Sequence, residues 1–204
     1  MHPGIVAASA QPEFVLDRRQ AVPALIGRHQ DFLIVTGLAG TARDIAALTG
    51  DGAHVYTMAG AMGGATAMGL GLALAQPSRR VLVVTGDGEL LMNIGTLATI
   101  AILNPPNLSI LCVDNGHYGE TGNQKSHTSL GVRLDRMAAG AGIGVVRTVN
   151  SEAEIADGAR ALRPQNATAF VLLRVRDGPP AVFKRNMSAA ACRERFRGAL
   201  LGHG

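Results

Sequence analysis

The chain has 204 residues and a formal net charge of +4; 47% of its residues are hydrophobic and only 3% are aromatic. This length allows one large domain or two small ones, and the hydrophobic fraction is ample for a buried core. The positive charge does not indicate nucleic-acid binding, because lysines and arginines are scattered and few aromatic rings are available to stack on bases. No apolar run approaches the roughly 18 residues of a membrane span and no signal segment opens the chain, so we expect a soluble, cytoplasmic protein without a membrane partner.

Short apolar runs alternate with segments of helical periodicity along most of the chain. Strands are predicted over residues 32–37, 54–58, 80–85, 108–114, 145–149 and 169–176. Helices are predicted over residues 16–29, 41–48, 62–76, 90–103, 134–141 and 151–162. Continuous apolar strands that alternate with helices predict a three-layer α/β/α fold with a mostly parallel sheet, since both faces of such strands are buried. We divide the chain into an N-terminal arm (1–15), one α/β domain (16–176) and a C-terminal extension (177–204) that is predicted to contact another subunit.

Capping residues support these boundaries. Ser151 and Glu154 form a capping box before one predicted helix, and Thr41 with Asp44 forms a shorter version before another. The pair Pro105-Pro106 should stop the preceding helix near Asn104.

Polar and glycine-rich residues follow three of the predicted strands, where ligands of a parallel α/β sheet bind. The first set is Gly86-Asp87-Gly88-Glu89, directly after a buried strand and before a helix. An aspartate at a strand tip beside a helix N-terminus suits magnesium with a bound diphosphate, although Gly-Asp-Gly by itself is also a common tight turn. The second set is Asp114-Asn115, at the tip of the next strand, which places Asn115 beside Asp87; Asp-Asn-Gly alone would again fit a turn.

The third set is the glycine-rich stretch 59–65, which includes Gly60, Ala61 and Met62. One interpretation is the start of a helix with a core methionine. Another is dinucleotide binding, but Gly60-x-x-Gly63-Gly64 lacks the Gly-x-Gly-x-x-Gly order, and that interpretation leaves the match of Asp87 with Asn115 unexplained.

Together these motifs resemble the signature of thiamine diphosphate enzymes, Gly-Asp-Gly followed one helix and one strand later by a pair of asparagines. Asp114 stands where many members have the first asparagine. The resemblance implies that Asp87 and Asn115 bind Mg²⁺ through their side chains and His117 through its backbone carbonyl. The cofactor-binding residues that it implies are Gly60, Ala61, Met62, Gly86, Asp87, Gly88, Glu89, Asn115, His117, Tyr118, Gly119 and Glu120.

The resemblance also assigns a role to each group of the 59–65 stretch. The Gly60 carbonyl and the Met62 amide would bind the aminopyrimidine ring, and the Met62 side chain would wedge beneath the cofactor. The resulting bend brings the cofactor's amino group against its thiazolium C2 proton.

Residues 90–100 and 118–124 are similar to one branch, the phosphonopyruvate decarboxylases and the beta subunits of sulfopyruvate decarboxylase. This similarity implies a non-oxidative decarboxylase subunit that acts on a small anionic 2-oxo acid. The polar loop 116–125 suits closure over a ligand, with the alternative of an ordinary solvated loop. The candidate catalytic residues are His117, Tyr118, Gln124 and Lys125.

The same resemblance implies a partner chain. Enzymes of this class take a catalytic glutamate from a pyrimidine-binding domain, and the sequence contains no second α/β domain to supply it. We therefore expect a pyrimidine-binding alpha-type subunit in a two-plus-two heterotetramer. The alternatives are a subunit of an acetolactate synthase-like carboligase, or a catalytically idle thiamine diphosphate-binding regulatory or assembly subunit.

Overall fold

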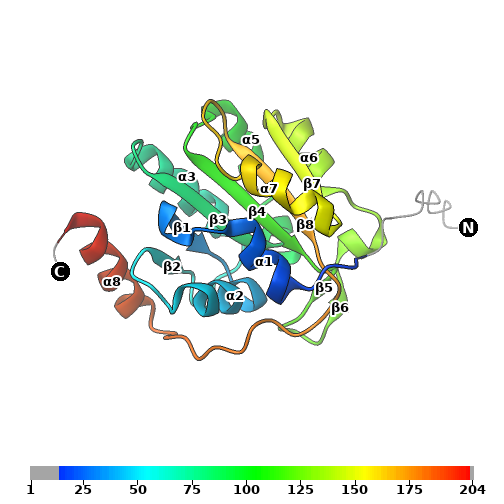
Figure 1. Cartoon of the computed structure of the whole chain (residues 1–204), viewed down its shortest axis with the longest axis horizontal. Coiled ribbons are helices and arrows are strands. Elements are labelled where there is room, and N and C mark those ends of the chain that lie inside the picture. The colour runs from blue at the N-terminus through cyan, green and yellow to red at the C-terminus, as the bar shows by residue number, and fades with distance from the viewer. Residues whose placement is uncertain (1–13, 203–204) are drawn as a thin grey trace, which may run out of the picture.

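A six-stranded parallel sheet forms the middle layer of the molecule (Figure 1). The computed structural model describes residues 14–202, so most of the predicted N-terminal arm lies outside the described residues. The strand order is β2-β1-β3-β4-β8-β7, which confirms the predicted fold class. The strands are β1 (Phe32–Thr36), β2 (Val55–Thr57), β3 (Arg80–Gly86), β4 (Leu108–Asp114), β7 (Val145–Val149) and β8 (Ala169–Arg174).

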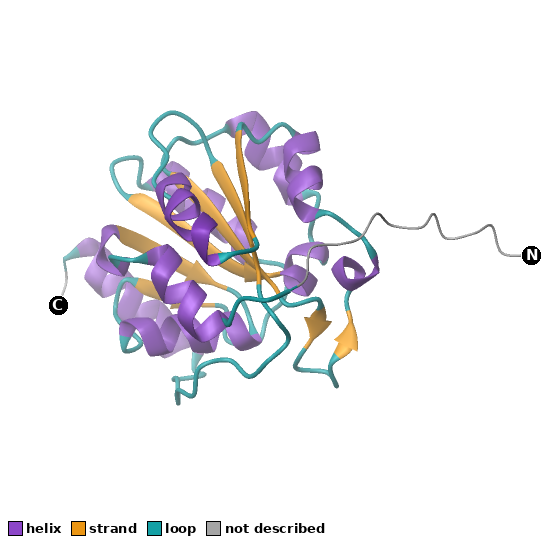
Figure 2. Cartoon of the chain, turned by 45° about the vertical axis from the view of Figure 1, so that its right-hand side comes forward, coloured by secondary structure: helices purple, strands orange, loops and turns teal. Residues whose placement is uncertain are grey.

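Helices cover both faces of this sheet (Figure 2). One hydrophobic core lies between the sheet and α1 (Arg18–Ile26), α2 (Ala39–Thr49) and α7 (Ile155–Ala161). The other lies between the sheet and α3 (Ala65–Ala75), α5 (Thr96–Leu103) and α6 (Leu134–Ala141). Alternate residues of β3 point into opposite cores. Val81 and Val83 belong to the core under α3, α5 and α6, and Leu82 and Val84 belong to the core under α1, α2 and α7. That two-sided burial explains why the strands read as unbroken apolar runs.

Two predicted helix boundaries are confirmed. Ser151 and Glu154 form the expected capping box before the 3-10 turn η3 (Glu152–Glu154), which leads into α7. Helix α5 ends at Leu103, and Asn104 takes a left-handed conformation just before the two prolines.

Two other predictions were wrong. Thr41 does not cap α2, because the helix already begins at Ala39. The Thr41 hydroxyl instead donates to the Leu38 carbonyl at 3.0 Å, and Asp44 turns away to accept from the Arg18 guanidinium. The single helix predicted over residues 90–103 is two helices, α4 (Asp87–Leu91) and α5. The chain between them bends so that the Asn93 amide donates to the Gly63 carbonyl at 3.2 Å.

The C-terminal extension packs against its own domain. Its helix α8 (Ala189–Leu201) lies beside the edge strand β2, where the Phe196 ring meets Tyr56 edge-on at 5.8 Å between centroids. Arg195 donates two hydrogen bonds of 3.0 Å to Asp51. The segment before α8 runs past the carboxyl ends of the strands, from the end of β8 toward α2 (Figure 1). No helix within residues 14–202 is long and apolar enough to cross a membrane.

Two glycines of α3 give a matched test of how tightly this helix packs on the sheet. A methyl group at Gly69 would overlap the Val83 side chain of β3, whereas one at Gly71 would meet no atom within 4 Å. We expect Gly69→Ala to lower the free energy of unfolding by about 1–3 kcal/mol. Gly71→Ala should raise it by up to about 1 kcal/mol, because alanine favours the helical backbone. Denaturant unfolding measures both, and equal effects of the two changes would contradict this packing.

Candidate functional site

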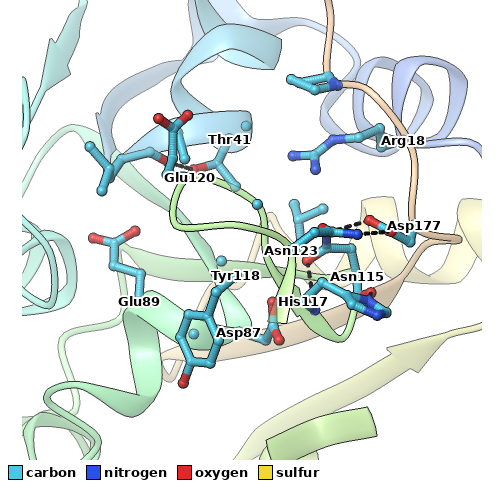
Figure 3. Close-up of a pocket in the computed structure, with 18 of the residues that line it drawn as sticks. Arg18, Thr41, Asp87, Glu89, Asn115, His117, Tyr118, Glu120, Asn123 and Asp177 are labelled. Carbon is cyan, nitrogen blue, oxygen red and sulfur yellow. Dashed lines mark hydrogen bonds between the residues drawn. The ribbon is translucent and has the colours of Figure 1, made fainter. Parts of the chain in front are cut away.

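A cavity of about 570 Å³ opens at the carboxyl ends of β3 and β4 (Figure 3). This volume is within the usual range for small-molecule and cofactor sites. Its walls come from segments far apart in sequence, because the strand ends, the start of α2, the loop after β4 and the C-terminal extension converge there. The lining includes Arg18, residues 38–41, Arg43, Met62, residues 86–89, Met92, Val113, Asn115, residues 117–121, Asn123 and residues 177–180.

Asp87 lies at the floor of the cavity, where β3 passes into α4. Its side chain is buried, and its Oδ2 atom accepts hydrogen bonds from the hydroxyls of Ser126 and Thr128. Gly88 has no room for a side chain, since a methyl group there would overlap the Tyr118 ring. The glycine after the aspartate therefore lets an aromatic ring from the neighbouring loop lie against the strand tip.

A second buried carboxylate, Asp114, lies beside Asp87 at the tip of β4. The Thr128 hydroxyl lies 2.7 Å from the Asp114 Oδ1 atom and 3.2 Å from Asp87 Oδ2. Burial raises the pKa of Asp87, and burial together with the Asp87 charge raises the pKa of Asp114 to about 6. The Arg174 guanidinium, 3.6 Å from Asp114, offsets part of this effect. Two carboxylates held this close favour a cation at the strand tips.

Asn115 and His117 lie at the opening of the loop after β4. The Asn115 amide nitrogen donates to Asp177 at 3.2 Å, and its oxygen faces the His117 backbone N–H at 3.4 Å. The His117 Nδ1 atom lies 2.9 Å from the Asn115 carbonyl. Because a carbonyl only accepts, Nδ1 carries the proton and the imidazole is fixed in that tautomer.

The oxygen atoms at these strand tips fit a hard cation. Within residues 14–202 there is no cluster of three or more His, Cys, Asp or Glu side chains arranged for a metal. A cation here would instead draw on one carboxylate, one amide oxygen and one backbone carbonyl, with ligand oxygens completing its shell. Such mixed oxygen sets with few carboxylates are typical of Mg²⁺ that binds together with a phosphate group.

The glycine-rich stretch before α3 contributes one side chain to the cavity. Met62 lines the wall and is 37% exposed, which differs from a methionine buried in a core. Gly60 and Ala61 are exposed and do not line the cavity, and a side chain at Gly60 would meet no atom within 4 Å. The backbone at Gly60 is therefore accessible to a ligand or to another chain.

Two glutamates face the cavity in different environments. Glu89 is buried, accepts from the Thr85 hydroxyl at 2.9 Å, and has its pKa raised by burial. A side chain at Gly37 would overlap its carboxylate, so that glycine makes room for it. Glu120 is half-exposed and pairs with Arg43 at 3.3 Å.

The loop after β4 brings only some of its predicted residues to the cavity. Its ends pair as a short hairpin, β5 (His117–Tyr118) with β6 (Gln124–Lys125), followed by the 3-10 turn η2 (His127–Leu130). Tyr118, Gly119 and Glu120 line the cavity, and so do Thr121 and Asn123. Gln124 hydrogen-bonds within the loop to Thr121, and neither Gln124 nor Lys125 is part of the wall.

Sequence reasoning did not find three parts of the wall. Residues 38–41 reach the wall after a turn in which Ala39 has a left-handed backbone. Because the residue there is an alanine and not a glycine, the sequence did not indicate that conformation. Arg18 enters from α1, held by an ion pair with Asp44 at 2.7 Å. Residues 177–180 could have been found, since β8 neighbours β4 and a polar turn after β8 emerges at the same sheet edge.

The fold and the cavity define a class: an α/β protein that binds its ligand at the carboxyl ends of a parallel sheet. Residues 42–175 match the family model described as "Thiamine pyrophosphate enzyme, C-terminal TPP binding domain". The chain therefore belongs to the thiamine pyrophosphate enzymes, thiamine pyrophosphate being a synonym of thiamine diphosphate, and the predicted resemblance is confirmed.

Individual relatives agree with this membership. Sulfopyruvate decarboxylase subunit beta of Methanocaldococcus jannaschii is 44% identical over 97 residues, which cover 48% of this chain and 51% of that one. Phosphonopyruvate decarboxylase of Streptomyces viridochromogenes is 34% identical over 169 residues, covering 82% of this chain and 42% of that one. The matched regions thus span about half the length of these relatives.

A solved structure shares the fold. The thiamine diphosphate-dependent 4-hydroxybenzoylformate decarboxylase of Rhodococcus jostii superposes with a TM-score of 0.62 at 21% identity, covering 86% of this chain and 35% of that one. At this identity the likeness concerns the fold alone.

Proposed function

We propose that this chain is the beta-type subunit of a thiamine diphosphate- and Mg²⁺-dependent decarboxylase of a small anionic 2-oxo acid. The observation that carries the proposal is that Asp87 and Asn115 both line a cavity of cofactor size, just beyond the ends of the paired strands β3 and β4, in a chain of this enzyme family. The names of the relatives, sulfopyruvate and phosphonopyruvate decarboxylase, supply the reaction type and the substrate class.

Each part of the cavity has a task in this proposal. Asp87, the Asn115 amide oxygen and the His117 carbonyl would hold Mg²⁺, and the backbone of residues 86–88 would bind the diphosphate. When bound, thiamine diphosphate supplies an electron sink for the electron pair left behind as carbon dioxide departs. Ser126 and Thr128 fix the Asp87 carboxylate from behind, so it does not reorient when the cation arrives.

Two lining residues supply donors for an anionic substrate. Arg43 reaches the cavity from α2 and Asn123 from the loop after β4, and each has N–H groups besides those that face Glu120 and Asp177. These are charged and neutral hydrogen-bond donors suited to a carboxylate, sulfonate or phosphonate.

A partner chain completes the site in this proposal. The match to phosphonopyruvate decarboxylase leaves 58% of that protein outside the aligned region, which is room for a further domain in that protein. The Methanocaldococcus jannaschii relative is named as a subunit beta, which likewise implies a second subunit in that enzyme. We propose a pyrimidine-binding alpha-type subunit in a two-plus-two assembly, with residues 16–176 as the cofactor-binding domain.

Co-expression with a candidate alpha-type subunit tests the function. Release of carbon dioxide would be scored across pyruvate, phosphonopyruvate and sulfopyruvate, with Mg²⁺ and thiamine diphosphate present. We expect release from at least one of the two acids that carry a second anionic group, and less from pyruvate. A carboligation product from pyruvate would instead support the acetolactate synthase-like alternative. Cofactor binding without turnover would support the idle subunit.

Met62→Ala is expected to lower turnover about 10²-fold while changing cofactor affinity little, because the side chain would set only the bend of the cofactor. Met68 offers a matched control, since it is 38% exposed and does not line the cavity. Turnover and cofactor affinity would be measured for both variants. A methionine needed only for packing would show itself as a stability loss of about 2–5 kcal/mol with turnover retained, and that result would remove the wedge role.

A further inference from the structure

The C-terminal extension reaches the proposed metal site through Asp177. Its strand of origin, β8, is hydrogen-bonded to β4, so the chain leaving β8 passes the tip where Asn115 lies. The two oxygens of Asp177 accept from two amides, Asn115 Nδ2 at 3.2 Å and Asn123 Nδ2 at 2.7 Å. Figure 3 shows both hydrogen bonds at the edge of the cavity. The family match ends at residue 175, so Asp177 lies beyond the domain that defines the family.

From this contact we infer that Asp177 is a positioning residue that orients the Asn115 amide for Mg²⁺, an inference that rests on the proposed function. A carboxylate offers only acceptors, so the group of Asn115 that faces it must be the NH₂. The amide oxygen then points to the other side, where the His117 N–H lies. The usual ambiguity between amide oxygen and nitrogen is removed by the chemistry of the neighbour.

The orientation matters because only the oxygen of the amide binds a hard cation. A reversed Asn115 would present its NH₂ group to the cation, and one protein ligand would be lost. Hydrogen-bond partners behind a metal ligand are typically worth about 10–100-fold in metal affinity.

A second contact fixes the segment that carries Asp177. The Ala181 backbone N–H donates to Asp44 at 3.0 Å, and Asp44 is itself held by Arg18 at 2.7 Å. Residues 177–181 are thus tied at both ends as they pass along the cavity wall. Asp177 is held by the fold at the place where it meets the amide.

Binding of Mn²⁺, which takes the same oxygen ligands, tests the inference without any turnover. Free Mn²⁺ would be followed by electron paramagnetic resonance during titration of the complex with its alpha-type subunit, at one fixed concentration of thiamine diphosphate. We expect Asp177→Ala to weaken Mn²⁺ affinity about 10–100-fold. Asp177→Asn should also weaken it, because asparagine offers a donor as well as an acceptor and no longer dictates the orientation. Asp157→Asn is the control, an exposed aspartate on α7 paired with Arg147 and Arg160, and should match the parent.

The outcomes separate this inference from the proposed function. If the parent chain binds Mn²⁺ and both Asp177 variants bind within about twofold of it, the positioning role is overturned and the metal site stands. If the parent does not bind Mn²⁺ with thiamine diphosphate, the metal site itself is wrong and the inference falls with it. Unfolding curves without metal confirm that each variant is folded.

Discussion

Asp87→Ala is expected to abolish the Mg²⁺-dependent binding of thiamine diphosphate, and Asn115→Ala is expected to do the same. Asp87 supplies the only carboxylate in the proposed ligand set. Asp114 cannot readily replace it, because it is fully buried, its Oδ1 atom accepts from the Gly116 N–H at 3.0 Å and its Oδ2 atom faces the Arg174 guanidinium at 3.6 Å. Calorimetric titration of the cofactor, with and without Mg²⁺, measures the effect on the complex with its partner subunit.

A second substitution separates metal loss from misfolding. Asp87→Ala leaves the Ser126 hydroxyl without its carboxylate acceptor, which costs about 1–3 kcal/mol for a buried group, whereas Thr128 keeps Asp114 as an acceptor. Asp87→Asn has nearly the same shape and keeps an acceptor oxygen for Ser126, so it should be more stable than the alanine variant while still binding metal poorly. Cofactor binding that is unchanged in both Asp87 variants and in Asn115→Ala would contradict the assignment of these residues as metal ligands.

The residues at the strand tips could be predicted because the geometry of a parallel sheet brings the carboxyl ends of its strands together, independently of the loop conformations. Strands β4 and β7 were predicted with the same bounds that the structure has, since polar or turn-forming residues end each apolar run. Once those strands are placed in a parallel sheet, residues just beyond their ends share one edge. Asp87 and Asn115 were found by this argument, and the pairing of β3 with β4 agrees with it.

The rest of the cavity depends on contacts between residues distant in sequence, which local sequence patterns do not predict. Arg18 reaches the wall only because Asp44, 26 residues away, accepts its hydrogen bond. The start of α2 follows from the backbone turn at Ala39, so the local Thr41–Asp44 pattern misled the prediction. Similarly, Gln124 looked like a ligand-binding residue because it lies in a polar loop, yet its amide is used to close that loop.

We expect the isolated chain to be inactive even when saturated with thiamine diphosphate and Mg²⁺, and to gain activity only with an alpha-type partner. In the proposed assembly the catalytic glutamate comes from the partner's pyrimidine-binding domain, and the two glutamates that line this cavity have contacts of their own. Glu89 is enclosed beside Thr85 and Gly37 at the strand tips, and Glu120 is paired with Arg43.

The exposed rim of the cavity gives a physical reason for the same dependence. Met62 and Met92 line the cavity and are 37% and 64% exposed, which leaves two apolar side chains open to solvent. A covering subunit would bury this surface and exclude the water that otherwise reaches the reacting atoms. Mixing separately purified subunits and following carbon dioxide release tests this, with an Asp87→Asn chain plus partner as the inactive control. Robust turnover by the isolated chain would overturn the split-site proposal. Activity that rises with partner concentration and saturates near one partner per chain would support an equimolar assembly of the two subunits.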